Sequence, residues 1–169
     1  MKSAIHAQQM NDLRRASVDD VDRRLVDLLS EDGRRTNADL AAVLGLAAST
    51  VHARVRALIA RGVVKGFHAS VDQASIGRGL QALVGVTLRP GARQENITAF
   101  AVRVRQLPQV IQVFFVAGAD DFLVHIAVEG SSELREFVVE HLSGQPSVAS
   151  TRTSIVFDYH RNVVAAPFE

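Results

Sequence analysis

The chain has 169 residues, of which 47% are apolar, and a formal net charge of only +1, so it suits two small domains with cores of their own and is not a polycation as a whole. The absence of cysteine excludes disulfide bonds, thiolate metal sites and cysteine nucleophiles, and it fits a reducing compartment. No apolar run approaches the length of about 18 residues that a membrane span needs, and no signal-peptide core is present, so we expect a cytoplasmic protein with no membrane partner.

Residues 1–16 are expected to form a loose N-terminal arm. The first predicted helix follows, with Ser17 or Asp19 as its N-cap and Gly33 near its end. Its apolar residues recur at i, i+4, i+7 and i+8, a spacing that places them on one helix face. These residues are Val21, Leu25, Leu28 and Leu29.

Residues 36–61 predict two further helices around a turn at Gly45. Thr36 and Asp39 have the spacing of a capping box, and Gly45 is suited to end the first of these helices. The expected inward residues are Leu40, Val43 and Leu44 in the first helix and Val51, Val55, Leu58 and Ile59 in the second. With the preceding helix, this arrangement is typical of a helix-turn-helix domain.

The opposite face of the second helix is narrow and suits the major groove of DNA, which is about 12 Å wide. No acidic residue occurs over residues 40–71, so a polyanion is the natural partner of this stretch. Arg54 lies beside the buried stripe, and it either reaches a phosphate or pairs with an acid such as Asp22 or Asp27. The candidate DNA-binding residues of this helix are Ser49, Thr50, His52, Arg54 and Arg56.

Residues 62–71 resemble a β-hairpin wing with Gly66 at its tip, which completes a predicted winged helix-turn-helix domain over residues 17–71. Lys65 and His68 of this wing either contact DNA phosphates or are solvated edge charges. Residues 72–80 are rich in turn formers and read as a linker.

The second half alternates strand, helix, strand, strand, helix, strand, which predicts an α+β ferredoxin-like βαββαβ sandwich over residues 81–160 and a tail at 161–169. Both helices would cover one face of the sheet, yet the strands are apolar at nearly every residue. A second copy of the chain is the economical cover for the other face, so we expect a two-fold dimer with two recognition helices. The predicted elements are residues 83–88, 94–107, 110–116, 122–128, 133–142 and 151–157.

A candidate ligand site lies in the loop between the second and third predicted strands of this domain. Gly118 precedes two carboxylates there, Asp120 and Asp121. Open backbone N–H groups would suit a ligand carboxylate, and Asp121 would suit its ammonium group. The alternative is an ordinary hairpin turn, for which the same residues are favourable.

Several short motifs, taken in this order, resemble the Lrp/AsnC (feast/famine) family of transcriptional regulators of bacteria and archaea. The resemblance spans residues 18–161. Its clearest pieces are Asp19-Asp20-Val21-Asp22, Gly45-Leu46, Arg54-Val55, Arg61-Gly62-Val63-Val64-Lys65-Gly66-Phe67 and Val116-Ala117-Gly118-Ala119-Asp120-Asp121-Phe122.

The resemblance implies a regulator that binds double-stranded DNA and whose RAM/ACT-like C-terminal domain forms a homodimer, a tetramer or an octamer. It also implies an amino-acid or related metabolite as effector, with no other cofactor and no metal. The effector pockets of the family lie between dimers and use the loop that matches Gly118, Asp120 and Asp121, together with positions near Thr151 and Thr153.

Three departures from the family pattern stand out. Ala47 replaces the serine that usually caps the recognition helix, unless Ser49 takes over that role. Ala53 and Ala57 occur where basic or polar residues are common, which predicts few phosphate contacts. Asp120 replaces an aromatic residue, which either favours a polar or basic effector or prevents a pocket.

Two other function classes are alternatives to a DNA-binding regulator. One is a metabolite sensor that acts on protein partners. The other is an enzyme built on the ferredoxin-like domain, which contains three histidines but no metal-ligand spacing, nucleophile motif or phosphate loop. We therefore expect no catalytic residues. The three histidines are His125, His141 and His160.

Overall fold

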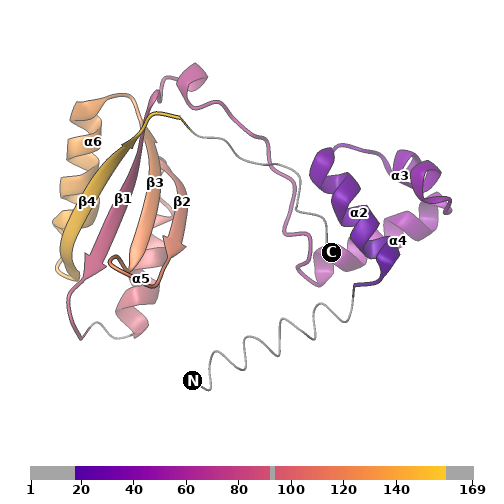
Figure 1. The fold of residues 1–169 in the computed structure, drawn as a ribbon, viewed down its shortest axis with the longest axis horizontal. Helices are drawn as coiled ribbons and strands as arrows, with labels where there is room; N and C mark the ends of the chain where they lie inside the picture. The colour runs from indigo at the N-terminus through magenta and orange to yellow at the C-terminus, as the bar shows by residue number, and fades with distance from the viewer. Residues whose placement is uncertain (1–17, 92–93, 159–169) are drawn as a thin grey trace. The chain divides into compact units, whose positions relative to one another are not determined.

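The computed structural model describes residues 18–91 and 94–158, shown in colour in Figure 1. The predicted N-terminal arm, the predicted tail, Ser17 and His160 lie outside the described residues. The chain divides into two compact units, with Ala69 closing the first and Ser70 opening the second.

The described residues of the N-terminal unit form three helices: α2 (Asp20–Glu31), α3 (Asn37–Leu44) and α4 (Ala48–Ala60). The axes of α3 and α4 are bent by 107° relative to each other, within the range of helix-turn-helix pairs. The core shared by all three helices contains Leu25, Leu28, Leu29, Leu40, Ala41, Val51 and Leu58. Within the described part of the chain, no single helix is long and apolar enough to cross a membrane; only the bent pair of α3 and α4 passes on length and composition.

The helices α2 and α3 begin at the side-chain caps that the sequence predicts, and α3 ends at the predicted glycine. Asp19 caps α2, and Thr36 forms a reciprocal capping box with Asp39 at the beginning of α3. The hydroxyl of Thr36 donates to the Asp39 carboxylate, which lowers the pKa of that carboxyl. Gly45 ends α3 with a left-handed φ of 66°. Two residues expected to point inward do not, because Val43 is 53% and Ile59 43% exposed.

The predicted wing is wrong: residues 61–72 are all described, and they contain no strand. After α4 the N–H groups of Val63 and Val64 both donate to the carbonyl of Leu58, and both valines pack against the helical core. Gly66 then turns the chain with a φ of 148°. Among the described residues of this unit no further strand is available to support a short hairpin, and an isolated hairpin of that size is marginal in water.

The C-terminal unit has the predicted βαββαβ order, with an added short 3₁₀ turn, η1 (Ala74–Ile76), before the first strand. Its four-stranded antiparallel sheet has the order β2-β3-β1-β4, in which the two central strands come from different halves of the repeat. The elements are β1 (Leu80–Leu88), α5 (Gln94–Val104), β2 (Val110–Phe115), β3 (Phe122–Val128), α6 (Ser131–Phe137), the π-helical η2 (Val138–Ser143) and β4 (Val148–Val156).

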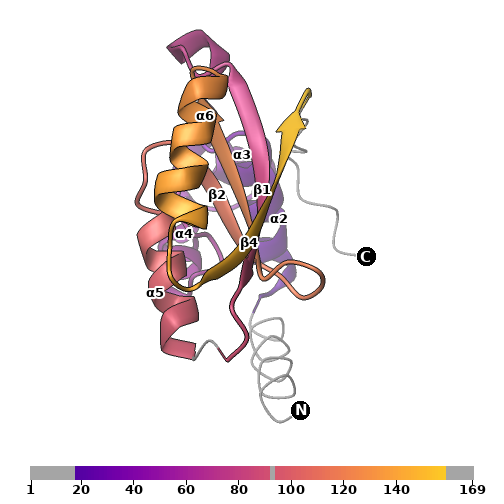
Figure 2. The same cartoon turned by 90° about the vertical axis from the view of Figure 1, so that its left-hand side faces the viewer.

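Both long helices of this unit, α5 and α6, cover the same face of the sheet (Figure 2). The core between them and the sheet contains alternate residues of the central strands, including Val84, Val86, Val124 and Ile126. Phe100 of α5 packs on Phe122 of β3, with 4.9 Å between ring centroids.

The face of the sheet opposite the helices, here called the open face, is less apolar than expected. The strand registers place Leu83, Leu123 and Phe114 on it, but polar residues of β1, β3 and β4 share it. These polar residues are Gln81, Thr87, His125, Ser150, Arg152 and Ser154. The expectation of a continuous apolar surface is therefore wrong for this face.

Candidate functional site

The face of α4 that lies away from the helical core carries the predicted DNA-binding residues. Val51 and Leu58 point into the core, so the residues on the opposite side of α4 are exposed. Ala53 and Ala60 leave the centre of the exposed face flat, and they allow close approach of a duplex. The polar side chains exposed there are Ser49, Thr50, His52 and Arg56.

The beginning of α4 has no side-chain cap, because its N-cap residue is Ala47. The carbonyl of Ala47 accepts from the N–H groups of Thr50 and Val51. Ser49 makes no capping bond to this helix end, so it does not replace the missing serine. The first N–H groups of α4 thus remain for an outside acceptor such as a phosphate.

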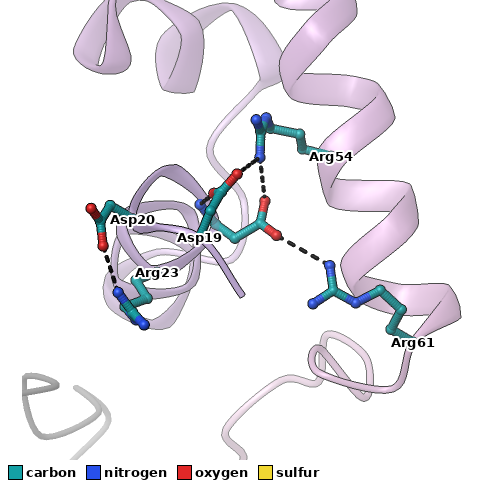
Figure 3. Close-up of polar contacts among 6 residues, drawn as sticks. Asp19, Asp20, Arg23, Arg54 and Arg61 are labelled. Atoms are coloured by element: carbon teal, nitrogen blue, oxygen red, sulfur yellow. Dashed lines mark hydrogen bonds and ion pairs between the residues drawn. The ribbon is translucent and has the colours of Figure 1, made fainter. Parts of the chain in front are cut away.

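Arg54 is drawn to the inner side of α4 by two carboxylates of α2 (Figure 3). Its Nη1 lies 2.7 Å from an oxygen of Asp19 and 2.9 Å from an oxygen of Asp22. Pairing with Asp22 is one of the two roles expected for Arg54, whereas Asp27 takes no part in this pair. The two carboxylates raise the pKa of the Arg54 guanidinium. Arg61, one residue beyond α4, donates to the second oxygen of Asp22 at 3.2 Å.

The segment that follows α4 places Lys65 and His68 at the surface. Phe67 of this segment packs over Gly33, where a Cβ would lie 2.9 Å from the Phe67 ring. The segment is thus held against the end of α2 without strand pairing. Lys65 remains a candidate for a phosphate contact, but from an extended segment and not from the tip of a wing.

The loop between β2 and β3 is bound to β1 by backbone and carboxylate hydrogen bonds. The N–H of Asp121 donates to the carbonyl of Val86, and the Asp121 carboxylate accepts from the N–H of Leu88 at 2.7 Å. Gly118, with a φ of 148°, provides a backbone conformation that other residues rarely adopt. Asp121 therefore has a structural contact through one of its two carboxylate oxygens.

Asp120 turns to the open face of the sheet, where its carboxylate lies directly over Gly85. A Cβ at Gly85 would be 2.6 Å from an oxygen of Asp120, so only glycine leaves room for this carboxylate. Arg152 of β4, directly opposite Gly85 in the register, donates to Asp120 at 2.6 Å. The Asp120 side chain is only 12% exposed. Sequence reasoning missed Gly85 and Arg152, because only strand pairing brings them to the loop.

The five predicted effector residues do not form one cluster. Thr151 pairs with Val86 and Thr153 with Val84, two core residues, so both threonines are on the helix-covered side of the sheet. Asp120 lies on the opposite side. The structure thus groups Gly118, Asp120 and Asp121 in one loop and separates them from the two threonines.

The described histidines of this domain have structural surroundings. The buried His125 lies 2.9 Å from Gln81 through Nε2, and burial lowers the pKa of its imidazole. His141 packs edge-on against the ring of Phe137. Over residues 18–91 and 94–158, no group of three or more histidine, aspartate or glutamate side chains is arranged to hold a metal ion.

Comparison with protein families matches both halves of the chain. Residues 18–59 match the profile of the AsnC-type helix-turn-helix domain, and residues 81–163 match that of the Lrp/AsnC ligand binding domain. The first match contains α2, α3 and nearly all of α4. The second contains the strands of the sheet and the loop at Gly118.

Individual relatives cover nearly the whole chain. The regulator AldR of Mycobacterium tuberculosis is 44% identical over 161 residues, which are 95% of this chain and 88% of the relative. The crystal structure of MtbAldR has a TM-score of 0.79 and 38% identity, over 87% of this chain and 96% of that one. A transcriptional regulator of Neisseria meningitidis, solved as its L-methionine complex, has a TM-score of 0.76 and 26% identity, over 86% of this chain and 94% of that one.

Proposed function

Since the chain belongs to the Lrp/AsnC family of transcriptional regulators, we propose that it reads a specific DNA sequence with α4 and responds to an amino acid or related metabolite. The chain is a DNA-binding transcriptional regulator with a ligand-binding domain, and it is not an enzyme. The observation that carries the proposal is the exposed face of α4, which is flat, free of acidic residues and flanked by Arg56. The cytoplasmic location stays a prediction, and it is consistent with binding to DNA.

The proposed DNA contacts divide between base edges and phosphates. Arg56 has the length and donors to reach a guanine edge or a phosphate in the major groove. Lys65 is suited to contact one DNA phosphate, and the uncapped N–H groups at the beginning of α4 are suited to bind a second phosphate. Arg54 is also proposed to contact DNA, while it keeps its ion pairs with Asp19 and Asp22. The remaining proposed contacts come from Ser49, Thr50 and His52.

Replacing one arginine in each of two helices tests this interface. Arg56→Ala should weaken binding to a duplex selected by the wild-type protein about tenfold, the loss expected for one good contact. Arg24→Ala removes the same charge from an exposed position on α2 and should leave binding to that duplex nearly unchanged. Fluorescence anisotropy at several salt concentrations measures both variants. Equal binding by Arg56→Ala and the wild type would contradict the proposed recognition face.

We propose that the effector binds at the loop containing Gly118, Asp120 and Asp121. The loop offers open backbone at Gly118, and the second carboxylate oxygen of Asp121 suits an ammonium group. Thr151 and Thr153 are on the other side of the sheet, so a neighbouring copy would have to supply them to the same pocket. The L-methionine complex of the Neisseria meningitidis regulator supports an amino acid as the first class of ligand to test.

A thermal-shift screen with the free amino acids tests the effector site. At least one should raise the melting temperature of the wild-type protein, because a ligand that binds only the folded state stabilises it. Asp121→Ala should abolish that rise, whereas Glu136→Ala, which removes an exposed acid of α6, should retain it. An unchanged rise in Asp121→Ala would refute the assignment of Asp121.

We further propose a homodimer that forms through the open face of the sheet, with a tetramer or an octamer as a larger assembly. Leu83, Phe114 and Leu123 provide the apolar part of this face. Phe114 is 45% exposed in the single chain, so contact with a second copy would remove apolar surface from water. A two-fold dimer would also present two α4 helices to a palindromic DNA site.

A further inference from the structure

The buried carboxylate of Asp22 joins α2 to Arg54 within α4 and to Arg61, the C-cap residue of α4. Arg54 donates to one oxygen of Asp22 at 2.9 Å, and Arg61 donates to the other at 3.2 Å. The two arginines are seven residues apart, or about 10 Å along a helix axis, so they flank Asp22 on one side of α4. The Asp22 side chain is only 7% exposed, unlike most acidic residues.

The same network is bound to the beginning of α2. Asp19 caps this helix by accepting from the N–H of Asp22 at 2.8 Å, and its other oxygen accepts from Arg54 at 2.7 Å. The N–H of Asp22, then the Arg54 guanidinium, lower the pKa of the Asp19 carboxyl. The carboxylates of the N-cap residue Asp19 and of Asp22 thus both bind arginines of α4 or its C-cap, and Figure 3 shows Asp19, Arg54 and Arg61 in this network.

These contacts add a directional restraint to that of the apolar core. Leu25, Val51 and Leu58 hold the helices together, but hydrophobic contact has no preferred direction and does not by itself define the rotation of α4 about its axis. Two charged hydrogen bonds at separate points of α4 do have a preferred direction. Base recognition depends on that rotation, because side chains of α4 must meet base edges at hydrogen-bond distance.

We propose that Asp22 is a positioning residue for DNA recognition: by holding Arg54 and Arg61, it sets the rotation of α4 that presents Arg56 and Thr50 to the groove. This inference rests on the proposed recognition by α4. It makes a prediction opposite in sign to simple electrostatics. Removing a negative charge near DNA should strengthen binding, whereas loss of the Asp22 contacts should weaken binding to the specific sequence.

Asp20 provides a matched control on the same turn of α2. Its side chain is 95% exposed and pairs with Arg23 of its own helix, away from α4 (Figure 3). Asp22→Asn and Asp20→Asn therefore remove the same charge from neighbouring positions, but only Asp22→Asn weakens the contacts to α4. Any difference between the two variants reports on those contacts and not on net charge.

The experiment compares the full-length variants on two duplexes, one selected by the wild-type protein from a random pool and one scrambled from it. Asp22→Asn should bind the selected duplex about tenfold more weakly than wild type, the loss of about one base contact, and the scrambled duplex as well as or better than wild type. Asp20→Asn should bind both duplexes as well as or better than wild type. Asp22→Glu, which keeps the charge but moves the carboxylate, should also lose preference for the selected duplex.

Circular dichroism melting separates positioning from stability, and binding is measured well below the melting temperature of each variant. An Asp22→Asn protein that melts lower but keeps the wild-type ratio of the two affinities would overturn the proposal, because Asp22 would then be only structural. Equal gains in affinity by both variants would overturn it as well. A wild-type protein that selects no sequence would instead contradict the proposed function itself.

Discussion

At the scale of single residues, the contact between Gly85 and Asp120 shows how one glycine can determine the place of a charged side chain. The carboxylate of Asp120 occupies the space where any other residue would have its Cβ, and Arg152 binds that carboxylate from the neighbouring strand. The loop and the sheet are therefore joined on the open face through a side chain that sequence reasoning treated only as part of a ligand loop.

Gly85→Ala should displace the Asp120 side chain and destabilise the C-terminal domain by about 1–3 kcal/mol, the usual cost of overpacking. In an Asp120→Ala background the added methyl group meets no carboxylate, so the same substitution should cost about 1 kcal/mol or less. Denaturant unfolding of the four proteins gives this double-mutant cycle. Equal costs of Gly85→Ala in both backgrounds would show that Asp120 does not limit the space over Gly85.

We expect His125 to make the stability of the sheet depend on pH. Burial lowers the pKa of its imidazole below the ordinary value of 6.5. As the pH falls through 6.5, the unfolded chain binds a proton at His125 before the folded chain does, so the free energy of unfolding should decrease. His125→Gln should remove part of this decrease. Unfolding curves of both proteins at pH 8 and at about pH 5.5 measure the difference, and parallel losses would contradict this role of His125.

At the scale of elements, the two helices of the helix-turn-helix differ in how they begin. The hydroxyl of Thr36 accepts the N–H of Asp39 and caps α3, whereas Ala47 leaves α4 without a side-chain cap. Ala47→Ser should therefore stabilise the N-terminal domain by about 1 kcal/mol, and Thr36→Ala should destabilise it by a similar amount. Thermal unfolding measures both changes. If Ala47→Ser leaves the melting temperature unchanged, the missing cap is not a weakness of α4.

The connection after α4 illustrates why local sequence signals can mislead about an element. The valines and glycines of residues 62–71 have the composition of a hairpin, but a strand also needs a partner. Val63 and Val64 bond to the last turn of α4 and pack on the helical core, so they are not available for strand pairing. Composition alone does not distinguish these two outcomes.

At the scale of the whole molecule, the open face of the sheet is the face that α5 and α6 of the C-terminal unit leave uncovered (Figure 2). Phe114→Glu would place a charge among Leu83 and Leu123, so the proposed dimer should dissociate to monomers at micromolar concentration. Val139→Glu adds the same charge at an exposed residue on η2 and should leave the dimer intact. Sedimentation velocity distinguishes these states. A monomeric wild-type protein would contradict the dimer directly.

The residues of this chain suffice to predict three helices, the βαββαβ order and the family, because caps, periodicity and short motifs are local properties. Thr36, Gly45 and the apolar runs that form the strands are visible in the sequence without knowledge of their partners. The proposed DNA-binding face of α4 is assigned from the same periodicity, and its contacts with DNA stay a prediction.

Only the tertiary structure decided which charges meet and on which side of the sheet the loop residues lie. Arg54 could be assigned to an acid or to a phosphate from its helical angle, and its pairing with Asp19 and Asp22 depends on how α2 crosses α4. Asp120 and Arg152 are 32 residues apart, and strand pairing alone brings them together. Such contacts depend on packing between distant segments, and periodicity within one segment carries no information about that packing.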